Sequence, residues 1–292
     1  MRAVLLALTL SCALGAHSQQ ADWSAVEKAM GRQGKPLAGG VIRFGMPRAD
    51  LKVTLQGVTL QPAFALGSWA AFGGDPKRAM LMGDLVVTVS EMPQVISKLK
   101  AGGVEISAIH NHVVGETPRV MYIHIGGHGD AVEMARALHN ALAATGTPRE
   151  APAASAGAKS PLDRAAIEKA MGKQGTVAGE VLQFSFARPE QIREEGMEVP
   201  ATMGTSTSIN FEPAAQGQVA TTGDYVLVGE EVNKVISSLT SNGVAVTALH
   251  NHMLNDTPRL FFLHFWGVGE PAKIVSAVRK ALDQTASGKP AK

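Results

Sequence analysis

The chain has 292 residues, of which 45% are hydrophobic and 18% are charged, and its formal net charge at pH 7 is +2. This composition is typical of a folded protein, and the length suffices for two domains that each bury a core. A chain this close to neutral does not produce the positive electrostatic field that attracts a polyanion, so nucleic acid is not an expected partner.

Residues 1–18 are predicted to be an export signal. Arg2 supplies a positive start, residues 3–14 are apolar, and Ala16 and Ser18 are small residues at the two positions that determine cleavage. The apolar run is too short to span a membrane. We therefore expect a periplasmic or secreted protein, the alternative being an ordinary buried or anchoring N-terminal helix.

Cys12 is the only cysteine and lies inside this segment. The mature chain would then contain no disulfide and no thiolate ligand for a metal. A membrane would become a partner only if Cys12 carried a lipid. The preceding residues, Thr9-Leu10-Ser11, lack the leucine that lipoproteins usually have three positions before the cysteine.

The spacing of apolar residues predicts the elements of a first unit in chain order. A short helix starts at Ser24, strands follow at 41–47, 51–60, 63–72 and 81–89, and a helix over 92–99 ends at Gly102-Gly103. Two more strands at 104–113 and 119–125 precede a helix over 130–144. Gly83-Asp84 is expected at a turn that enters a strand, as is Gly223-Asp224, the alternative being that each aspartate supports a residue of the site.

The first unit then repeats after a segment rich in Pro, Ala and Ser at 146–161, which we interpret as a linker. Glu168-Lys-Ala-Met-Gly-Lys-Gln-Gly175 corresponds to Glu27-Lys-Ala-Met-Gly-Arg-Gln-Gly34. The prediction is an α+β protein with repeat domains at 22–145 and 162–286 and a tail at 287–292. Each domain should be a mostly antiparallel sheet with two or three packed helices.

A histidine motif occurs once in each repeat, within 109–127 and again within 249–267. Each copy contains His-x-His, then an acid followed by Thr-Pro-Arg, then a third histidine: His110, His112 and His124, and His250, His252 and His264. Residues two apart on a strand point to the same face, and an antiparallel return can bring the third histidine beside them. Three imidazoles with an open position are typical of catalytic zinc, and imidazole also suits copper, nickel and iron.

Several neighbours of these histidines could take part in chemistry. Glu116, like Asp256 in the second copy, could be a ligand or a general base, and His128 could be a fourth ligand or a proton shuttle. The second copy has Val268 at the position of His128. Arg119 and Arg259 could bind a carboxylate or phosphate, or could pair with the neighbouring acid.

Three functions remain open at this point. The most specific hypothesis is a divalent transition metal, zinc or copper, used for metal-assisted hydrolysis in which Glu116 activates water. The second is a non-catalytic periplasmic protein that binds metal or a small anionic ligand. The third is a structural or interaction domain whose histidines only hold the sheet. An enzyme would keep an open cleft over the histidines, whereas a storage or structural site would be closed.

The motifs also resemble the LppY/LpqO family of exported bacterial proteins of unknown function. The matching segments are Gly67–Phe72, Met82–Asp84, His124–Asp130, Thr247–His252, Thr257–Arg259 and Leu263-His264. The resemblance implies an exported protein with a duplicated domain, and some members of the family are lipoproteins. It implies no particular reaction. The second repeat departs from the pattern, because Ser206–Phe211 replaces the Gly-Ser-Trp-Ala-Ala-Phe segment and His128 has no counterpart.

Overall fold

The computed structural model describes residues 21–149 and 161–289. The predicted export signal and most of the predicted linker lie outside the described residues. No helix in the described part of the chain is long and apolar enough to cross a membrane.

The first repeat is a six-stranded antiparallel sheet with three helices, in the strand order β1-β2-β5-β6-β8-β7. The strands are β1 (Lys35–Leu37), β2 (Val41–Pro47), β5 (Gly67–Asp75), β6 (Arg78–Thr88), β7 (Glu105–His110) and β8 (Val120–Gly129). A small hairpin, β3 (Thr54–Leu55) with β4 (Val58–Thr59), stands apart from the sheet. The helices are α1 (Ser24–Met30), α2 (Met92–Ala101) and α3 (Ala131–Leu142).

The second repeat has the same arrangement, with the strand order β15-β17-β14-β13-β10-β9. Its strands are β9 (Thr176–Ala178), β10 (Val181–Ala187), β13 (Ser206–Pro213), β14 (Val219–Val228), β15 (Ala245–His250) and β17 (Leu260–Gly269). A separate small sheet contains β11 (Arg193–Glu194), β12 (Met197–Glu198) and β16 (Asp256–Thr257). The helices are α4 (Arg164–Met171), α5 (Gly229–Ser241) and α6 (Pro271–Leu282), with 3-10 turns at Ala201–Met203, Ala215–Gly217 and Ala286–Gly288.

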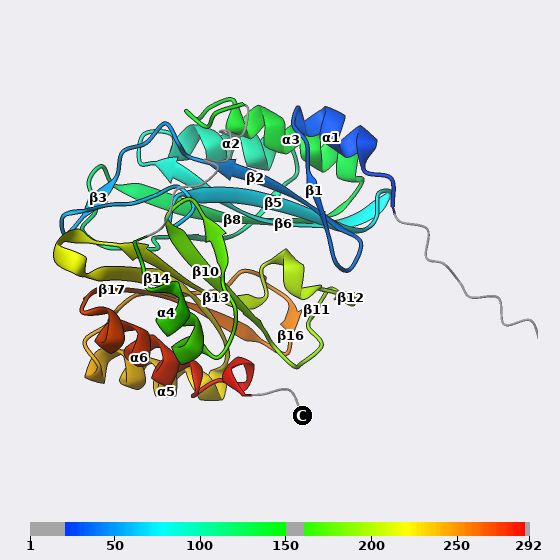
Figure 1. Ribbon diagram of the computed structural model, residues 1–292. Helices are drawn as coiled ribbons and strands as arrows, with labels where there is room; N and C mark the ends of the chain where they lie inside the picture. Colours follow the sequence, from blue (N-terminus) through cyan, green and yellow to red (C-terminus); the bar gives the residue numbers. More distant parts are fainter. Residues whose placement is uncertain (1–20, 150–160, 290–292) are drawn as a thin grey trace, which may run out of the picture.

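The two sheets face each other, and the helices of each repeat cover the opposite face of its own sheet (Figure 1). The central strands β6 and β14 are therefore buried on both faces for most of their length. Amphipathic helices bury their apolar stripe against one face, so the other face of each sheet becomes the contact between the repeats. The predicted α+β class, with two tandem domains of mostly antiparallel sheet, is confirmed.

Two apolar clusters from both repeats fill much of the space between the sheets. One joins Tyr122 and Phe64 of the first repeat to Trp266 of the second. The other joins Met80 and Met82 to residues of the second repeat that include Phe262. The core residues of both clusters are almost completely buried, so the repeats are held together mainly by buried apolar surface.

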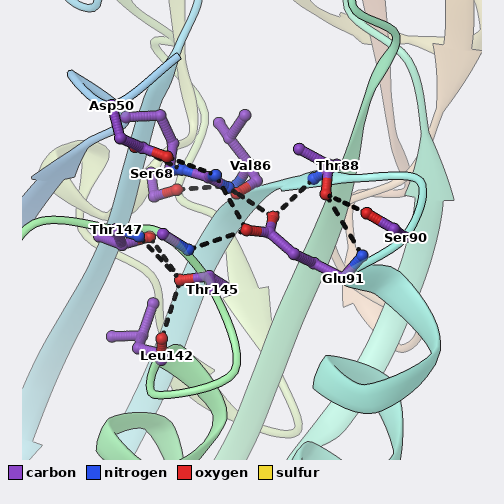
Figure 2. Close-up of polar contacts among 11 residues, drawn as sticks. Asp50, Ser68, Val86, Thr88, Ser90, Glu91, Leu142, Thr145 and Thr147 are labelled. Atoms are coloured by element: carbon purple, nitrogen blue, oxygen red, sulfur yellow. Dashed lines mark hydrogen bonds and ion pairs between the residues drawn. The ribbon is translucent and has the colours of Figure 1, made fainter.

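A buried arginine secures the end of each central strand. The Arg48 guanidinium donates to the Val86 carbonyl and to both oxygens of Asp50 and of Glu91. Glu91 also accepts from the Thr88 amide beside the start of α2 (Figure 2). Arg188 makes the corresponding contacts in the second repeat. Because every partner is satisfied, this network holds β6 and β14 in place without leaving a charge unpaired.

The interpretation of Gly83-Asp84 and Gly223-Asp224 as turns is wrong. Both pairs lie in the middle of a central strand, where Gly83 is opposite Ala70 of β5 and Gly223 is opposite Ile209 of β13. Glycine and aspartate are both depleted in strands. They occur here because the adjacent strand approaches closely at the glycine and the aspartate contacts a histidine.

Candidate metal centre

The six motif histidines gather in one cluster between the two sheets. His110 is the last residue of β7 and His250 the last residue of β15. His112 and His252 lie in the loops that follow these strands. His124 lies within β8 and His264 within β17. The sequence predicts one site in each repeat, and the structure brings both sets into a single site.

The rings are stacked across the boundary between the repeats. The His110 and His250 ring centroids are 3.8 Å apart at an interplanar angle of 15°. His112 packs against His264 at 3.9 Å, and His124 packs against His252 at 3.7 Å. The arrangement is pseudo-symmetric, because each contact has a counterpart in which the two repeats exchange roles.

An aspartate from each central strand completes the cluster. His112 Nε2 lies 3.0 Å from Asp84 Oδ2, and His252 Nε2 lies 3.1 Å from Asp224 Oδ2. These are ion-pair distances, but the rings are not oriented for an ordinary hydrogen bond. Asp84 is directly opposite His124 in the β6–β8 ladder, as Asp224 is opposite His264. Each repeat therefore contributes three imidazoles and one carboxylate.

The glycine before each aspartate orients the third histidine. His124 Nδ1 lies 3.2 Å from the Gly83 carbonyl, and His264 Nδ1 lies 2.7 Å from the Gly223 carbonyl. A carbonyl can only accept, so Nδ1 carries the proton and Nε2 presents a lone pair to the cluster. This is the usual way in which an outer contact prepares a histidine for a metal.

Only glycine fits at these two strand positions. A Cβ at Gly83 would lie 2.6 Å from the Trp69 carbonyl oxygen, and one at Gly223 would lie 2.0 Å from the Ser208 carbonyl oxygen. Both neighbours are backbone atoms of the adjacent strand and cannot move aside cheaply. The Gly-Asp pair thus combines close strand packing with a carboxylate directed into the interface.

The electrostatics keep several of these imidazoles neutral. Burial, followed by the neighbouring histidines, holds the pKa of His110 and of His250 far below the usual value. Burial also lowers the pKa of His264, to about 4. For Asp224, burial acts to raise the pKa, but His264 and His252 outweigh it, and the pKa is lowered. Neutral imidazole beside carboxylate is the protonation state that a metal ion requires.

Polar atoms without a hydrogen bond are concentrated in this cluster, and two of them, His112 Nε2 and His252 Nε2, lie at ion-pair distance from an aspartate. Eleven of the fifteen buried side-chain nitrogen and oxygen atoms that lack a hydrogen bond among the described residues belong to it. They are both ring nitrogens of His110, His250 and His252, one nitrogen each of His112, His124 and His264, and one oxygen each of Asp84 and Asp224. Each such atom costs about 1–3 kcal/mol if it stays unsatisfied, so the cluster fits a bound ion better than an apolar contact.

Three groups in the described part of the chain bring their ligand atoms within 4.8 Å of one another: His110 with His250 and His264, His124 with His250 and His252, and Asp84 with His110 and His124. Two of the three groups combine ligands from both repeats. Every two of these groups share a histidine. The geometry therefore suits one central ion more simply than two independent ones.

The asparagine of each His-Asn-His segment binds the opposite repeat. Asn111 Nδ2 donates to the Thr247 carbonyl at 3.0 Å, and Asn251 Nδ2 donates to the Ser107 carbonyl at 3.1 Å. Ser107 and Thr247 lie at the register shifts in β7 and β15. The bulges leave these carbonyls unpaired at the edge strands of the sheets. By donating to them, the asparagines align the two loops that carry His112 and His252.

The other predicted site residues lie outside this cluster. His128 is exposed, with Nδ1 3.5 Å from Glu195 Oε2. One oxygen of Glu116 accepts from the Val120 amide, and Glu116 is in none of the three groups. Arg119 is exposed. Arg259 pairs with Asp256 at 2.7 Å, which is the neighbouring-acid alternative considered for it.

Asp84 and Asp224 lie in the cluster itself, whereas their sequence context favoured a turn and gave them a supporting role only as the alternative; Tyr122 was not predicted as a site residue. The Tyr122 ring stacks on His112 at 3.4 Å, as Phe262 stacks on His252 at 3.4 Å. The signal for the aspartates was available, since a Gly-Asp pair recurs inside an otherwise apolar strand in both repeats. A charge at such a position needs a partner across the buried face.

Comparison with curated proteins finds no match. Two solved structures resemble the chain weakly. EtuB from Clostridium kluyveri is 10% identical, with 86% of this chain and 88% of that chain covered and a TM-score of 0.23. The trimeric bacterial microcompartment shell protein PduB is 14% identical, with 84% and 87% covered and a TM-score of 0.20. TM-scores this low mean that neither structural similarity supports a conclusion about function.

The family comparison covers most of the chain. One family model matches twice, at residues 24–144 and 165–284. The two matches contain the two sheets and all six clustered histidines. The chain therefore belongs to the family described as Domain of Unknown Function (DUF1259), of which it carries two copies in tandem.

Proposed function

We propose that this protein binds a divalent transition metal, zinc or copper, in the histidine cluster between its two repeats. The observation that carries the proposal is the concentration of buried polar atoms without a hydrogen bond in the cluster. A protein does not ordinarily bury so many unsatisfied imidazole nitrogens in one place. Nitrogen donors with one or two carboxylates suit zinc and copper better than magnesium or calcium.

The buried charges support about one divalent ion per chain. Asp84 and Asp224 bring two carboxyl groups to the cluster, at ion-pair distance from His112 and His252, while burial holds the pKa of His110 and of His250 below the usual value. A divalent ion bound among them would offset both carboxylates, because buried charges are normally paired or bound to a metal. The donors in the three ligand groups are His110, His124, His250, His252, His264 and Asp84, with His112 and Asp224 beside them.

The enclosure of the cluster supports binding rather than metal-assisted hydrolysis. His110, His124, His252 and His264 are each less than 10% exposed, and rings of the opposite repeat cover them. A hydrolase must keep a coordination position open to substrate. Glu116, which would activate water, belongs to none of the three ligand groups, and one of its oxygens accepts from the Val120 amide at the start of β8. The export signal predicted at 1–18 and the resemblance to LppY/LpqO proteins support a role outside the cytoplasm.

The test is metal content and zinc titration of the mature protein without a His tag. We expect about one zinc or copper ion per chain. The variant His110→Gln/His250→Gln removes the two central imidazoles and should bind none. His128→Gln is the matched control for zinc, because it changes an exposed histidine outside the cluster, and it should bind zinc as the native protein does. A native protein that stays metal-free after incubation with zinc and with copper would refute the proposal.

A further inference from the structure

A second group of metal-binding side chains lines a small pocket beside the cluster. The pocket has a volume of about 20 Å³ and is bordered by Met80, Met82, Met253, His128 and His252. A volume of this size holds roughly one water molecule or ion. His252 also belongs to the cluster, so the two sites adjoin.

The pocket runs from an exposed rim to a buried floor. His128 lies at the rim and is exposed. The three methionines form the floor, with exposed fractions of 1% for Met80, 4% for Met82 and 3% for Met253. Glu194 also borders the pocket, but its carboxylate accepts from the Asn255 amide. Glu105 and Ser107 border the pocket as well, but Glu105 is exposed and the Ser107 hydroxyl donates to the His252 carbonyl. The buried part of the lining therefore offers an ion mainly thioethers and the His252 imidazole.

The strand register explains why these side chains meet. Met80 and Met82 alternate with Asp84 along β6, so all three point to the face that meets the second repeat. On β8, His128 is directly opposite Met80, and Gly126 is directly opposite Met82. A row of donors thus leads from the rim to Asp84 and the histidine cluster.

The second repeat has no such row. Ala220 and Thr222 stand where the first repeat has Met80 and Met82, and Val268 stands at the position of His128. Trp266 replaces Gly126 and fills the corresponding space, where it packs on Phe64 and donates to Gln56. A Cβ at Gly126 would meet only the Leu81 carbonyl oxygen, at 3.7 Å. The absence of a side chain at Gly126 leaves room for the pocket in the first repeat.

The chemistry of the lining favours a soft ion. Thioether sulfur is a poor ligand for zinc but selects Cu(I), and imidazole is compatible with it. Methionines that serve only for packing fill irregular gaps, whereas these three border an open one. We propose that the pocket is a second metal site, selective for a soft monovalent ion such as Cu(I), with Met80, Met82 and Met253 as thioether ligands and His128 at the rim.

Methyl NMR of the full-length mature protein, labelled with carbon-13 in the methionine methyl groups, tests the proposal. Ag(I) serves as a probe that does not change oxidation state, and Cu(I) under anaerobic reducing conditions confirms the result. The signals of Met80, Met82 and Met253, assigned by single Met→Leu variants, should shift with Ag(I) both in the zinc-free and in the zinc-saturated protein. The core residues Met30 and Met46 are internal controls. Absence of Ag(I) binding, or equal shifts of the control signals, would overturn the proposal.

Affinity measurements on matched variants separate this site from the histidine cluster. Met80→Leu/Met82→Leu/Met253→Leu should weaken Ag(I) binding by more than about tenfold, the lower end of what disturbing a metal site costs. Met30→Leu/Met46→Leu should leave it unchanged, because leucine has nearly the volume of methionine. His110→Gln/His250→Gln should lose zinc and keep Ag(I). If zinc binds but Ag(I) does not, only the pocket proposal fails; if Ag(I) alone binds, only the cluster proposal fails.

Discussion

Glu212 is a buried acid at the contact between the repeats. It is 1% exposed, and its Oε2 accepts from the Gln61 amide of the first repeat at 3.2 Å. Its other oxygen has no hydrogen bond within the described residues. Burial raises the pKa of Glu212 to about 8, with a further rise from Glu180 that the Gln61 amide opposes. This carboxyl is therefore largely protonated in the folded protein near neutral pH.

The raised pKa makes the contact sensitive to alkali. Between the ordinary value of 4.5 and about 8, the folded state holds a proton that the unfolded state has lost. The stability contributed by the protonated side chain is thus complete below pH 4.5 and is lost as the pH rises through about 8. Glu212→Gln should be more stable than the native protein above about pH 8, by on the order of 5 kcal/mol. Near pH 4.5 the two proteins should be nearly equal in stability.

Urea unfolding at the two pH values measures this difference. All the histidines are shared by both proteins, so their titration cancels in the comparison. Glu230→Gln, an exposed change on α5, is the control and should show no gain at either pH. A gain for Glu212→Gln that is the same at both pH values would mean that ionisation of Glu212 does not affect the contact.

At the scale of elements, the ends of β7 and β15 position histidines and also form hydrogen bonds between the repeats. Each strand contains a register shift, and the asparagine beyond it reaches the bulge of the other repeat. The Ser107 hydroxyl also donates to the His252 carbonyl at 2.6 Å. The two loops that carry His112 and His252 are thus aligned by reciprocal hydrogen bonds between the repeats.

Removing both asparagines tests this reciprocal contact. Asn111→Ala/Asn251→Ala leaves the Thr247 and Ser107 carbonyls without their donors, which should cost about 1–2 kcal/mol at each site. Urea unfolding gives the free energy, and amide hydrogen exchange should quicken in β7 and β15. Asn233→Ala, an exposed change on α5, should have no effect. Unchanged exchange at these strand ends would show that apolar packing alone aligns the loops.

Alternation of apolar residues was sufficient to predict most strands, the three helices of the first repeat and the histidines that gather in the site. It failed where the other repeat determines the local structure. The sequence analysis expected His110 and His112 on one strand face, but the strand ends at His110 because Asn111 binds across the interface. Gly83-Asp84 was taken for a turn because neither residue favours strands, and only the facing sheet explains the pair.

At the scale of the whole molecule, duplication brings the histidines of both repeats into one shared cluster. Two of the three possible ligand groups combine histidines from both repeats. The repeat in the sequence implies the same fold twice, but it does not specify how the copies face each other. The sequence did contain one indication that the sheets face each other. β6 and β14 are apolar on both faces over most of their length, which is typical of a strand covered on both sides.

A shared site predicts that metal stabilises both repeats together. At a free zinc concentration of about 100 times Kd, binding adds about 2.7 kcal/mol to the free energy of unfolding. For a chain of this size the Tm should rise by roughly 5–10 °C, and amide protection should increase in β8 and β17 alike. Calorimetry and hydrogen exchange measure the two effects, with His128→Gln behaving as the native protein and His110→Gln/His250→Gln showing neither. Protection confined to one repeat would place the ion in that repeat alone, because an ion bound between the sheets must be released before either one can unfold.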